Sequence, residues 1–169
     1  MRVEAIYTAE AAGEPMADHE SIRAVDGGLA GDRYCTGTGH YSPFDVCQVT
    51  FVQAEALEAI SERSQLDVLD GQHRRNVVVR GGDVHDLLNH RFTVGDAQFE
   101  GTRERPPCRY LERVTGQDGL LRALADGKGG ICARVADPGA FSVGDEITDI
   151  EDLNNFESLV ANIRERVGK

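Results

Sequence analysis

The sequence lacks an apolar run long enough to cross a bilayer, because a transmembrane helix needs about 20 predominantly apolar residues. It also lacks a secretory signal, since Met1–Tyr7 has no long apolar core and meets charge at once. The cysteines, Cys35, Cys47, Cys108 and Cys132, include no CxxC pair, which argues against a closed structural zinc site. Although two disulfides are compatible with this count, we predict a cytoplasmic protein with reduced thiols.

Basic residues are in the minority, with 18 Lys and Arg against 29 Asp and Glu and a formal net charge of −11. This excess disfavours nonspecific attraction to nucleic acid or an anionic membrane, so we expect neither as a partner. A local basic pocket is then the one place where phosphate would bind. Acidity with few lysines is typical of the heavily hydrated surfaces of proteins from salty cytoplasm, and an ordinary acidic enzyme is the alternative. The glycine-rich segments match neither GxGxxG nor a Walker motif, so a nucleotide fold has no support.

The 169 residues are enough for one domain that buries about 70% of its extended surface without metal or disulfide staples. Short half-buried segments separated by glycine-rich turns predict a mainly β fold. The expected strands are 2–8, 21–25, 46–52, 77–79, 91–94, 97–102, 131–135 and the two halves of 141–148. Short helices are expected over 53–60 and 118–125.

The C-terminal segment 151–169 differs in kind from the rest of the chain. Its apolar residues recur at helical spacing, at Leu153, Phe156, Leu159, Val160, Ile163 and Val167. This pattern predicts an amphipathic helix that packs on the domain formed by residues 1–150 or on a partner chain.

Cys108 directly follows two prolines and lies among several arginines. Pro106 and Pro107 fix the backbone in a stiff, extended form, and the residues from Cys108 onward can begin a helical turn. A helix N-terminus and nearby guanidinium groups, those of Arg105 and Arg109, favour the thiolate. Such a thiolate can attack sulfur or carbon, or bind a soft metal. The alternative is a small, inert core residue, which is also our expectation for Cys132.

The run Arg74-Arg75-Asn76 stands at the mouth of a β-branched strand. Two guanidinium forks and an amide can grip a phosphate or a carboxylate, although charges that pair with surface acids are the alternative. Further upstream, residues 26–34 contain three glycines, which permit close backbone approaches, or a simple turn. His40, in the polar loop that follows, is expected to be solvated.

Taken together, these segments resemble the MOSC domain, named for the C-terminal domain of molybdenum-cofactor sulfurases and shared with the amidoxime-reducing components. The resemblance covers about residues 1–150, and its strongest part is the Arg-Arg-Asn strand combined with the Pro-Cys that follows a Gly-Asp hairpin. The matching segments are Gly28–Arg33, Val49-Thr50 before a Glu-bearing helix, Arg74–Val79, Leu87–Phe92 with Val94–Ala97, Arg105–Cys108, Gly129–Val135 and Val143–Asp145.

The resemblance implies a closed, mostly antiparallel β-barrel with short peripheral helices and a cleft that holds Cys108. It implies that Cys108 carries sulfur as a persulfide or ligates molybdenum, and that Arg74 and Asn76, with Arg75, hold the molybdopterin. Arg105 and Arg109 are expected to supply further anion contacts. The weaker candidates for the cleft wall are Gly31, Asp32, Thr102 and Lys128.

The sequence contains neither the pyridoxal-phosphate desulfurase domain of full sulfurases nor the extra barrel domain of the amidoxime reducers. We therefore expect a stand-alone member that handles molybdenum cofactor or sulfur, and that reduces N-hydroxylated compounds only with electrons from a partner. A noncatalytic carrier that docks on a desulfurase or a molybdoenzyme is the alternative. The expected partners are the pterin cofactor or a sulfur donor, and a homodimer is compatible with the size.

Overall fold

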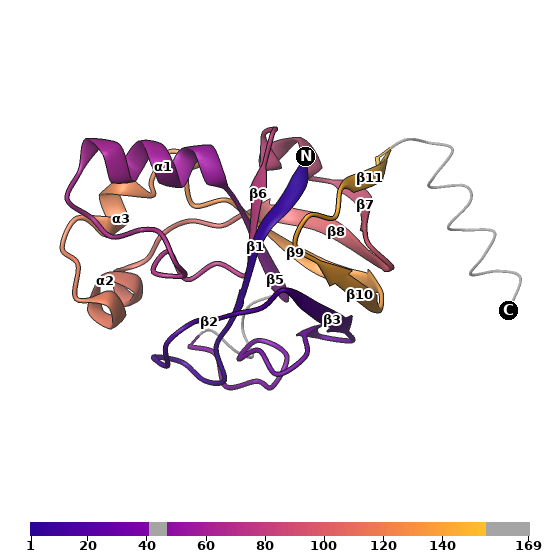
Figure 1. Cartoon of the computed structure of the whole chain (residues 1–169), viewed down its shortest axis with the longest axis horizontal. Helices are drawn as coiled ribbons and strands as arrows, with labels where there is room; N and C mark the ends of the chain where they lie inside the picture. Colours follow the sequence, from indigo (N-terminus) through magenta and orange to yellow (C-terminus); the bar gives the residue numbers. More distant parts are fainter. Residues whose placement is uncertain (41–46, 155–169) are drawn as a thin grey trace, which may run out of the picture.

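A curled, mixed β-sheet forms most of the protein (Figure 1). The computed structural model describes residues 1–40 and 47–154. Within these residues the sheet has eight strands, in the spatial order β11 (Ile147–Asp152), β7 (His90–Val94), β8 (Ala97–Glu104), β9 (Ile131–Asp137), β5 (Val49–Gln53), β6 (Val77–Arg80), β1 (Arg2–Thr8) and β2 (Ala17–Asp18). Every neighbouring pair is antiparallel except β5 and β6, which are parallel.

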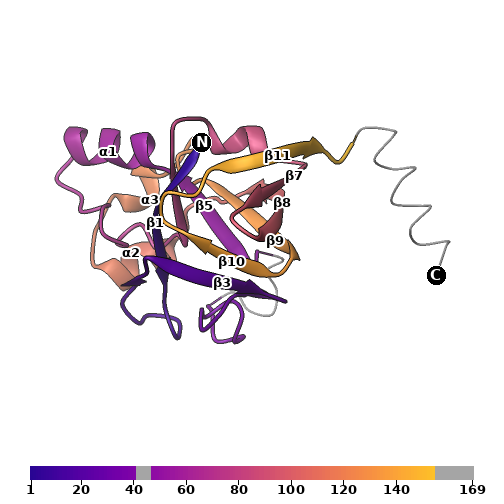
Figure 2. The same cartoon turned by 45° about the vertical axis from the view of Figure 1, so that its right-hand side comes forward.

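The sheet is open, so the prediction of a closed barrel is wrong. Its end strands, β11 and β2, are not paired with each other, and one isolated bridge between Arg2 and Glu146 joins β1 to the approach of β11. The reason lies in β10 (Gly139–Ser142), which pairs with β3 (Ser21–Val25) rather than with the main sheet. Together with β4 (Gly28–Leu29) these strands form a second, three-stranded sheet, and Figure 2 shows β10 and β3 side by side.

Four phenylalanines fill the inside of the curl. The ring centroid of Phe99 lies 5.4 Å from that of Phe51 and 5.6 Å from that of Phe141, and both pairs meet edge to face. Phe92 completes the cluster, at 5.4 Å from Phe51. Each such contact stabilises the fold by about 0.5–1.5 kcal/mol beyond its buried area. This core holds the main sheet against the small sheet.

A second core lies on the other side of the central strands, under the helices α1 (Ala54–Arg63), α2 (Arg109–Thr115) and α3 (Leu120–Ala123). Successive side chains of a strand point to opposite faces, so Val78 of β6 and Val52 of β5 face these helices. The 3-10 turn η1 (Val84–Leu87) buries Val84 and Leu87 in the first core. No helix in residues 1–40 and 47–154 combines the length and the apolar character needed to span a membrane.

Most element predictions are confirmed, with shifted boundaries. The strand expected over 46–52 begins at Val49, and the helix expected over 118–125 is the shorter α3. The helix expected from residue 151 does not begin there, since Glu151 and Asp152 pair with β7 as part of β11. The remainder of that predicted helix, from residue 155, lies outside the described residues.

Cys47 and Cys132 form a disulfide, so the prediction of reduced thiols is wrong for this pair. The two are 85 residues apart in sequence, yet their Cα atoms lie 5.0 Å apart. The antiparallel pairing of β5 with β9, in which Thr50 faces Cys132, brings them together. Cys132 is fully buried, as expected for a core residue.

Candidate functional site

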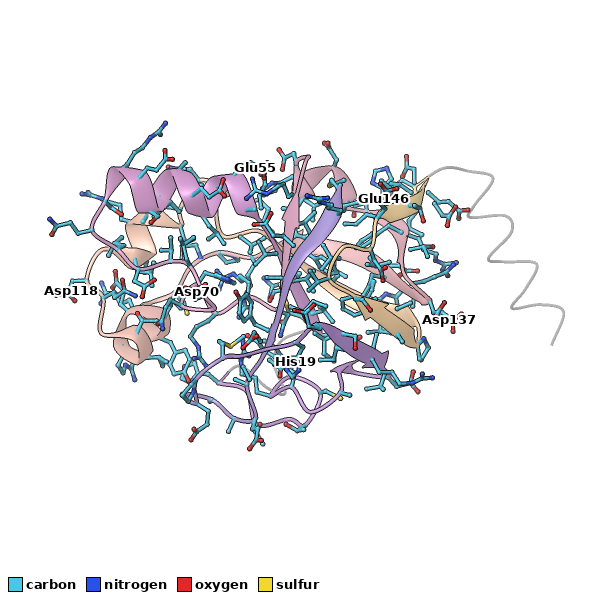
Figure 3. The ribbon with its side chains drawn as sticks, viewed as in Figure 1. His19, Glu55, Asp70, Asp118, Asp137 and Glu146 are labelled. Atoms are coloured by element: carbon cyan, nitrogen blue, oxygen red, sulfur yellow. A yellow bond between two sulfur atoms is a disulfide. The ribbon has the colours of Figure 1, made fainter. Side chains whose placement is uncertain are left out.

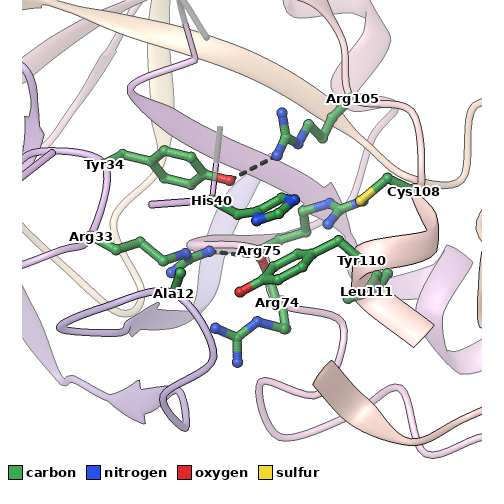
Figure 4. Close-up of a pocket in the computed structure, with 10 residues that line it drawn as sticks. All are labelled: Ala12, Arg33, Tyr34, His40, Arg74, Arg75, Arg105, Cys108, Tyr110 and Leu111. Carbon is green, nitrogen blue, oxygen red and sulfur yellow. Dashed lines mark hydrogen bonds between the residues drawn. The ribbon is translucent and has the colours of Figure 1, made fainter. Parts of the chain in front are cut away.

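A small pocket, of about 30 Å³, opens between the loop that follows β4, the loop that precedes β6 and the start of α2 (Figure 4). Its lining combines four guanidinium groups, aromatic rings and one thiol, from Ala12, Arg33, Tyr34, His40, Arg74, Arg75, Arg105, Cys108, Tyr110 and Leu111. None of these lining residues carries a carboxylate. The structure therefore concentrates positive charge at one place in an acidic protein.

Cys108 stands at the edge of this pocket as the N-cap residue of α2. Its backbone is extended, with φ −140° and ψ 158°, and the helix starts at Arg109. This geometry agrees with the predicted extended approach to Cys108 and confirms the helical turn that follows it. The thiol is partly exposed and outside any disulfide. A sulfur atom is thus available at the mouth of a cationic pocket.

Arg75 forms the buried floor of the pocket. Its Nε donates a 2.7 Å hydrogen bond to the Gly129 carbonyl, and its Nη1 donates to the His73 carbonyl at 3.2 Å. Its Nη2 is buried and has no hydrogen-bond partner within the described part of the chain. Burial, followed by repulsion from Arg105, lowers the pKa of Arg75 to about 10, while Tyr34 and then Cys108 oppose the shift.

Gly129 is required for this arrangement. A Cβ atom at this position would overlap the Arg105 carbonyl oxygen, so the two segments can approach only because residue 129 has no side chain. The approach places the Gly129 carbonyl against Arg75, and it places Arg105 on the opposite wall of the pocket.

Arg74 adopts a left-handed backbone conformation, with φ 57°. Residues other than glycine rarely adopt it, and such strain is concentrated at functional sites. Its Nη1 donates to the Glu14 carbonyl at 2.8 Å, whereas its buried Nη2 has no hydrogen-bond partner in residues 1–40 and 47–154. Burial and then the charge of Arg33 lower the pKa of Arg74.

Asp32 and Arg33 build the wall opposite Cys108. Asp32 is fully buried, and its carboxylate accepts hydrogen bonds from the backbone N–H groups of Ala9 and Tyr34. It also forms an ion pair with Arg33, with the Nη1 and Oδ1 atoms 3.0 Å apart. The Nη2 of Arg33 donates to the Arg74 carbonyl at 3.1 Å (Figure 4). The predicted residue Asp32 therefore lies behind the lining, where it orients Arg33.

Aromatic residues form the rim of the pocket. The Tyr34 hydroxyl accepts a 2.7 Å hydrogen bond from Arg105, and the His40 ring stacks on the Tyr110 ring with centroids 3.8 Å apart. His40 is exposed, as predicted, but it belongs to this site. Sequence reasoning missed Arg33, Tyr34 and Tyr110, although each is adjacent to a predicted site residue or to one of the matched motifs.

Asn76 lies beneath the pocket and is fully buried. Its side-chain oxygen accepts from the backbone N–H and the hydroxyl of Thr50, and its side-chain nitrogen donates to the Tyr7 carbonyl. These bonds tie β5 and β1 to the segment that carries both pocket arginines. The structure thus places the Asn76 amide in the scaffold, adjacent to the lining.

The structure places the remaining predicted residues away from the lining. Arg109 and Gly31 are exposed, and the Thr102 hydroxyl donates to the Cys132 carbonyl. Lys128 lines two other surface clefts, beside Ala123 and beside Asp126. Of the ten residues predicted for the site, the pocket brings together Arg74, Arg75, Arg105 and Cys108.

The chemistry available here follows from charge and softness. Four guanidinium groups, with one carboxylate close behind them, favour an anion that carries more than one negative charge. The Cys108 sulfur can bind a soft metal or accept sulfur. Among the described residues, no cluster of three or more His, Cys, Asp or Glu side chains could by itself hold a metal ion.

Comparisons with known proteins agree on the fold. A model of the MOSC domain matches residues 37–148. YuaD protein from Bacillus subtilis has a similar structure, at TM-score 0.70 and 23% identity over 86% of this chain and 93% of that one. YiiM from Geobacillus stearothermophilus is similar at TM-score 0.68 and 15% identity, over 87% of this chain and 73% of that one. YiiM from Escherichia coli is similar at TM-score 0.61 and 19% identity, over 88% of this chain and 70% of that one. No curated protein sequence matches the chain.

Proposed function

The chain belongs to the MOSC domain family, and on that premise we propose that its arginine-lined pocket binds the molybdenum cofactor, with Cys108 as the sulfur that contacts the metal. The family is associated with molybdenum-cofactor sulfurases and related enzymes. Within this proposal the pocket residues hold an anionic pterin, and the thiolate supplies the soft ligand.

The observation that carries the proposal is the Nη2 atom of Arg75. Arg75 is 4% exposed, and this N–H group has no hydrogen-bond acceptor among the described residues. A buried donor without a partner costs about 1–3 kcal/mol, and more when it is charged. An anion in the pocket removes this cost and neutralises the mutual repulsion of Arg75 and Arg105.

The donor groups present fit the phosphate of the pterin. Arg75 and Arg74 each offer a buried Nη2 donor with no acceptor among residues 1–40 and 47–154, and Arg105 offers a guanidinium on the opposite wall. Guanidinium forks match phosphate geometry, and a thiolate is a preferred ligand for a soft metal centre. When bound, the molybdenum cofactor supplies a centre for redox or sulfur-transfer chemistry. The chain's own residues bind the anion, orient it and set the thiolate beside it.

We assign Asn76 and Asp32 to positioning. Asn76 holds the loop segment that carries Arg74 and Arg75, and Asp32 holds Arg33 against the Arg74 carbonyl. Four further residues lie outside the lining described above, and their cofactor contacts stay predictions: Arg109, Gly31, Thr102 and Lys128.

The reaction class that we propose is reduction of N-hydroxylated compounds, with electrons from a partner protein. The test is an assay for reduction of an N-hydroxylated base with a reconstituted electron donor. Cys108→Ser is expected to abolish turnover, and full activity in this variant would contradict the assignment. Cys35→Ser is the matched control, because the Cys35 thiol lies outside the pocket lining, and burial and then Asp32 raise its pKa.

The direct test of binding is elemental analysis for molybdenum, zinc and sulfane sulfur, with pterin fluorescence, on protein from a cofactor-competent host. Molybdenum and pterin in the wild type and in Cys35→Ser, but not in Cys108→Ser, would support the proposal. Labile sulfur on Cys108 without metal or pterin would instead make the protein a sulfur carrier. The absence of molybdenum, pterin and labile sulfur together would overturn the proposal in favour of a noncatalytic module.

A further inference from the structure

A second cleft, of about 190 Å³, lies between β1, α1 and the loop that precedes β6. Its floor is apolar and is formed by Ala5, Ala54, Leu57 and Val78. Leu69, which is 40% exposed, extends this apolar surface to the outside. This volume is smaller than the roughly 300–1,000 Å³ of sites for drug-sized molecules, so the cleft suits a ligand of about one ring. The cleft is therefore large enough for a small organic ligand.

His73 contributes a buried polar group to the wall of this cleft. It is 1% exposed, and its Nδ1 accepts a 2.9 Å hydrogen bond from the backbone N–H of Arg75. Burial and then the charge of Arg75 lower the pKa of His73 to about 3, so the ring is neutral and its proton resides on Nε2. This Nε2–H donor has no hydrogen-bond acceptor within the described part of the chain.

The mouth of the cleft is acidic. Glu4, Glu58 and Asp70 line it, and Arg80 binds both Glu4 and Glu58. Asp70 makes no ion pair with any described residue, and Figure 3 shows it at the end of the molecule that carries α1 and α2. Burial, together with the charges of Asp70, Asp18 and Glu4, raises the pKa of Tyr7 in the same wall. The local field thus favours a cation and opposes an anion.

We propose that this cleft is a second ligand site, distinct from the arginine-lined pocket, for a small organic cation that also carries a hydrogen-bond acceptor. A protonated amine attached to a heteroaromatic ring has this chemistry. The acceptor pairs with His73 Nε2–H, the ring covers the apolar floor, and the ammonium group faces Asp70. The segment His73–Arg75 borders both sites, because the His73 ring lines the cleft and the Arg75 guanidinium lines the pocket.

The test uses the full chain at neutral pH with 4-(aminomethyl)pyridine as the probe, followed by calorimetry and by the side-chain 15N resonances of the histidines. Two matched probes isolate the groups: benzylamine lacks the acceptor, and 4-methylpyridine lacks the ammonium group. We expect the full probe to bind about two- to tenfold more tightly than benzylamine and to shift the His73 Nε2 resonance.

The matched variants are Asp70→Asn, which removes the charge at the mouth, and Asp67→Asn, an exposed residue outside the lining. Asp70 has φ 48°, a conformation that asparagine tolerates well, so the first variant is expected to fold. Asp70→Asn should lower the affinity for the probe by about two- to fivefold, and Asp67→Asn should leave this affinity unchanged. Failure of the wild type to bind the probe, equal binding of all three molecules, or no effect of Asp70→Asn would each overturn the site. None of these readouts depends on molybdenum.

Discussion

The Nη2 of Arg105 donates a 2.7 Å hydrogen bond to the hydroxyl of Tyr34, across 71 positions of sequence. The Tyr34 ring also lies near two cations, with the Arg33 guanidinium 4.7 Å and the Arg105 guanidinium 5.7 Å from its centroid. This aromatic ring joins the glycine-rich loop to the segment that leads to Cys108. It holds two positive charges on facing walls of the pocket, and such cation–π contacts stabilise by about 0.5–1 kcal/mol at exposed sites.

The first prediction concerns this link. Tyr34→Phe keeps the ring but removes one hydrogen-bond acceptor of Arg105, so the guanidinium is held less firmly toward the pocket. We expect the affinity for sulfate, used as a simple dianion and measured by calorimetry, to fall by about two- to tenfold. Arg122→Gln, an exposed change on α3, should leave the affinity unchanged. Equal affinities for wild type and Tyr34→Phe would show that the Arg105–Tyr34 bond does not organise the pocket.

The second prediction is a pH dependence of anion binding. Arg75 has a pKa of about 10 in the free protein, below its ordinary value, and a bound anion favours its charged form. Sulfate affinity should therefore be steady below that pKa and should fall as the pH rises through it, by up to about tenfold per pH unit. In Arg75→Gln the affinity should be weaker at all pH values and this added decline should be missing. Parallel pH profiles in the two proteins would contradict the role given to Arg75.

The third prediction concerns stability in acid. His73 has a folded pKa of about 3, against 6.5 for the unperturbed side chain. Between these values the unfolded chain binds a proton that the folded chain does not, so stability is lost as the pH falls below 6.5. The free energy of unfolding in urea should fall by up to about 1.4 kcal/mol per pH unit from this residue.

The control for this prediction is His73→Asn, whose side-chain oxygen can still accept from the Arg75 N–H. This variant lacks the titrating group, so its stability should depend less steeply on pH between about 6.5 and 5, above the range where most carboxylates titrate. If wild type and His73→Asn lose stability at the same rate over that interval, the His73 ring is not buried in its neutral form.

The fourth prediction distinguishes the disulfide from reduced thiols. Under denaturing, nonreducing conditions a thiol reagent should label Cys35 and Cys108 but not Cys47 or Cys132. Cys132→Ser should lower the free energy of unfolding by about 2–5 kcal/mol, because the bond closes a long loop. Cys35→Ser should change stability by no more than about 0.5 kcal/mol. Labelling of all four cysteines in freshly purified protein would show that the pair is reduced.

Local rules made much of this protein predictable. Alternating and β-branched segments predicted β1, β3 and β6, because a strand that is buried on one or both faces must carry that pattern. Val77–Val79 forms a continuous β-branched run because this strand lies in the parallel pair at the centre of the sheet and is buried on both faces. The approach to Cys108 was also readable, because proline restricts its own backbone and that of the preceding residue.

Local patterns could not predict whether the sheet is open or closed. Whether β10 pairs with β3 or completes a barrel depends on the packing of Phe141 against Phe99 and on the close approach of Gly139 to the Asp96 carbonyl, which no local pattern encodes. The same holds for Arg109, which lies between the pocket residues Cys108 and Tyr110 in sequence but outside the lining. Adjacency in sequence does not determine the side of the backbone from which a side chain projects.

The sequence by itself determined the chemistry of the site, namely a cysteine behind two prolines, two adjacent arginines before a buried strand, and the MOSC resemblance that joins them. Tertiary structure alone decided which groups meet. Tyr34 with Arg105, His40 with Tyr110 and Cys47 with Cys132 are each brought together from distant segments by strand order and register. The physical reason is that conformational preferences act over a few residues, whereas these contacts depend on how the whole sheet curls around its aromatic core.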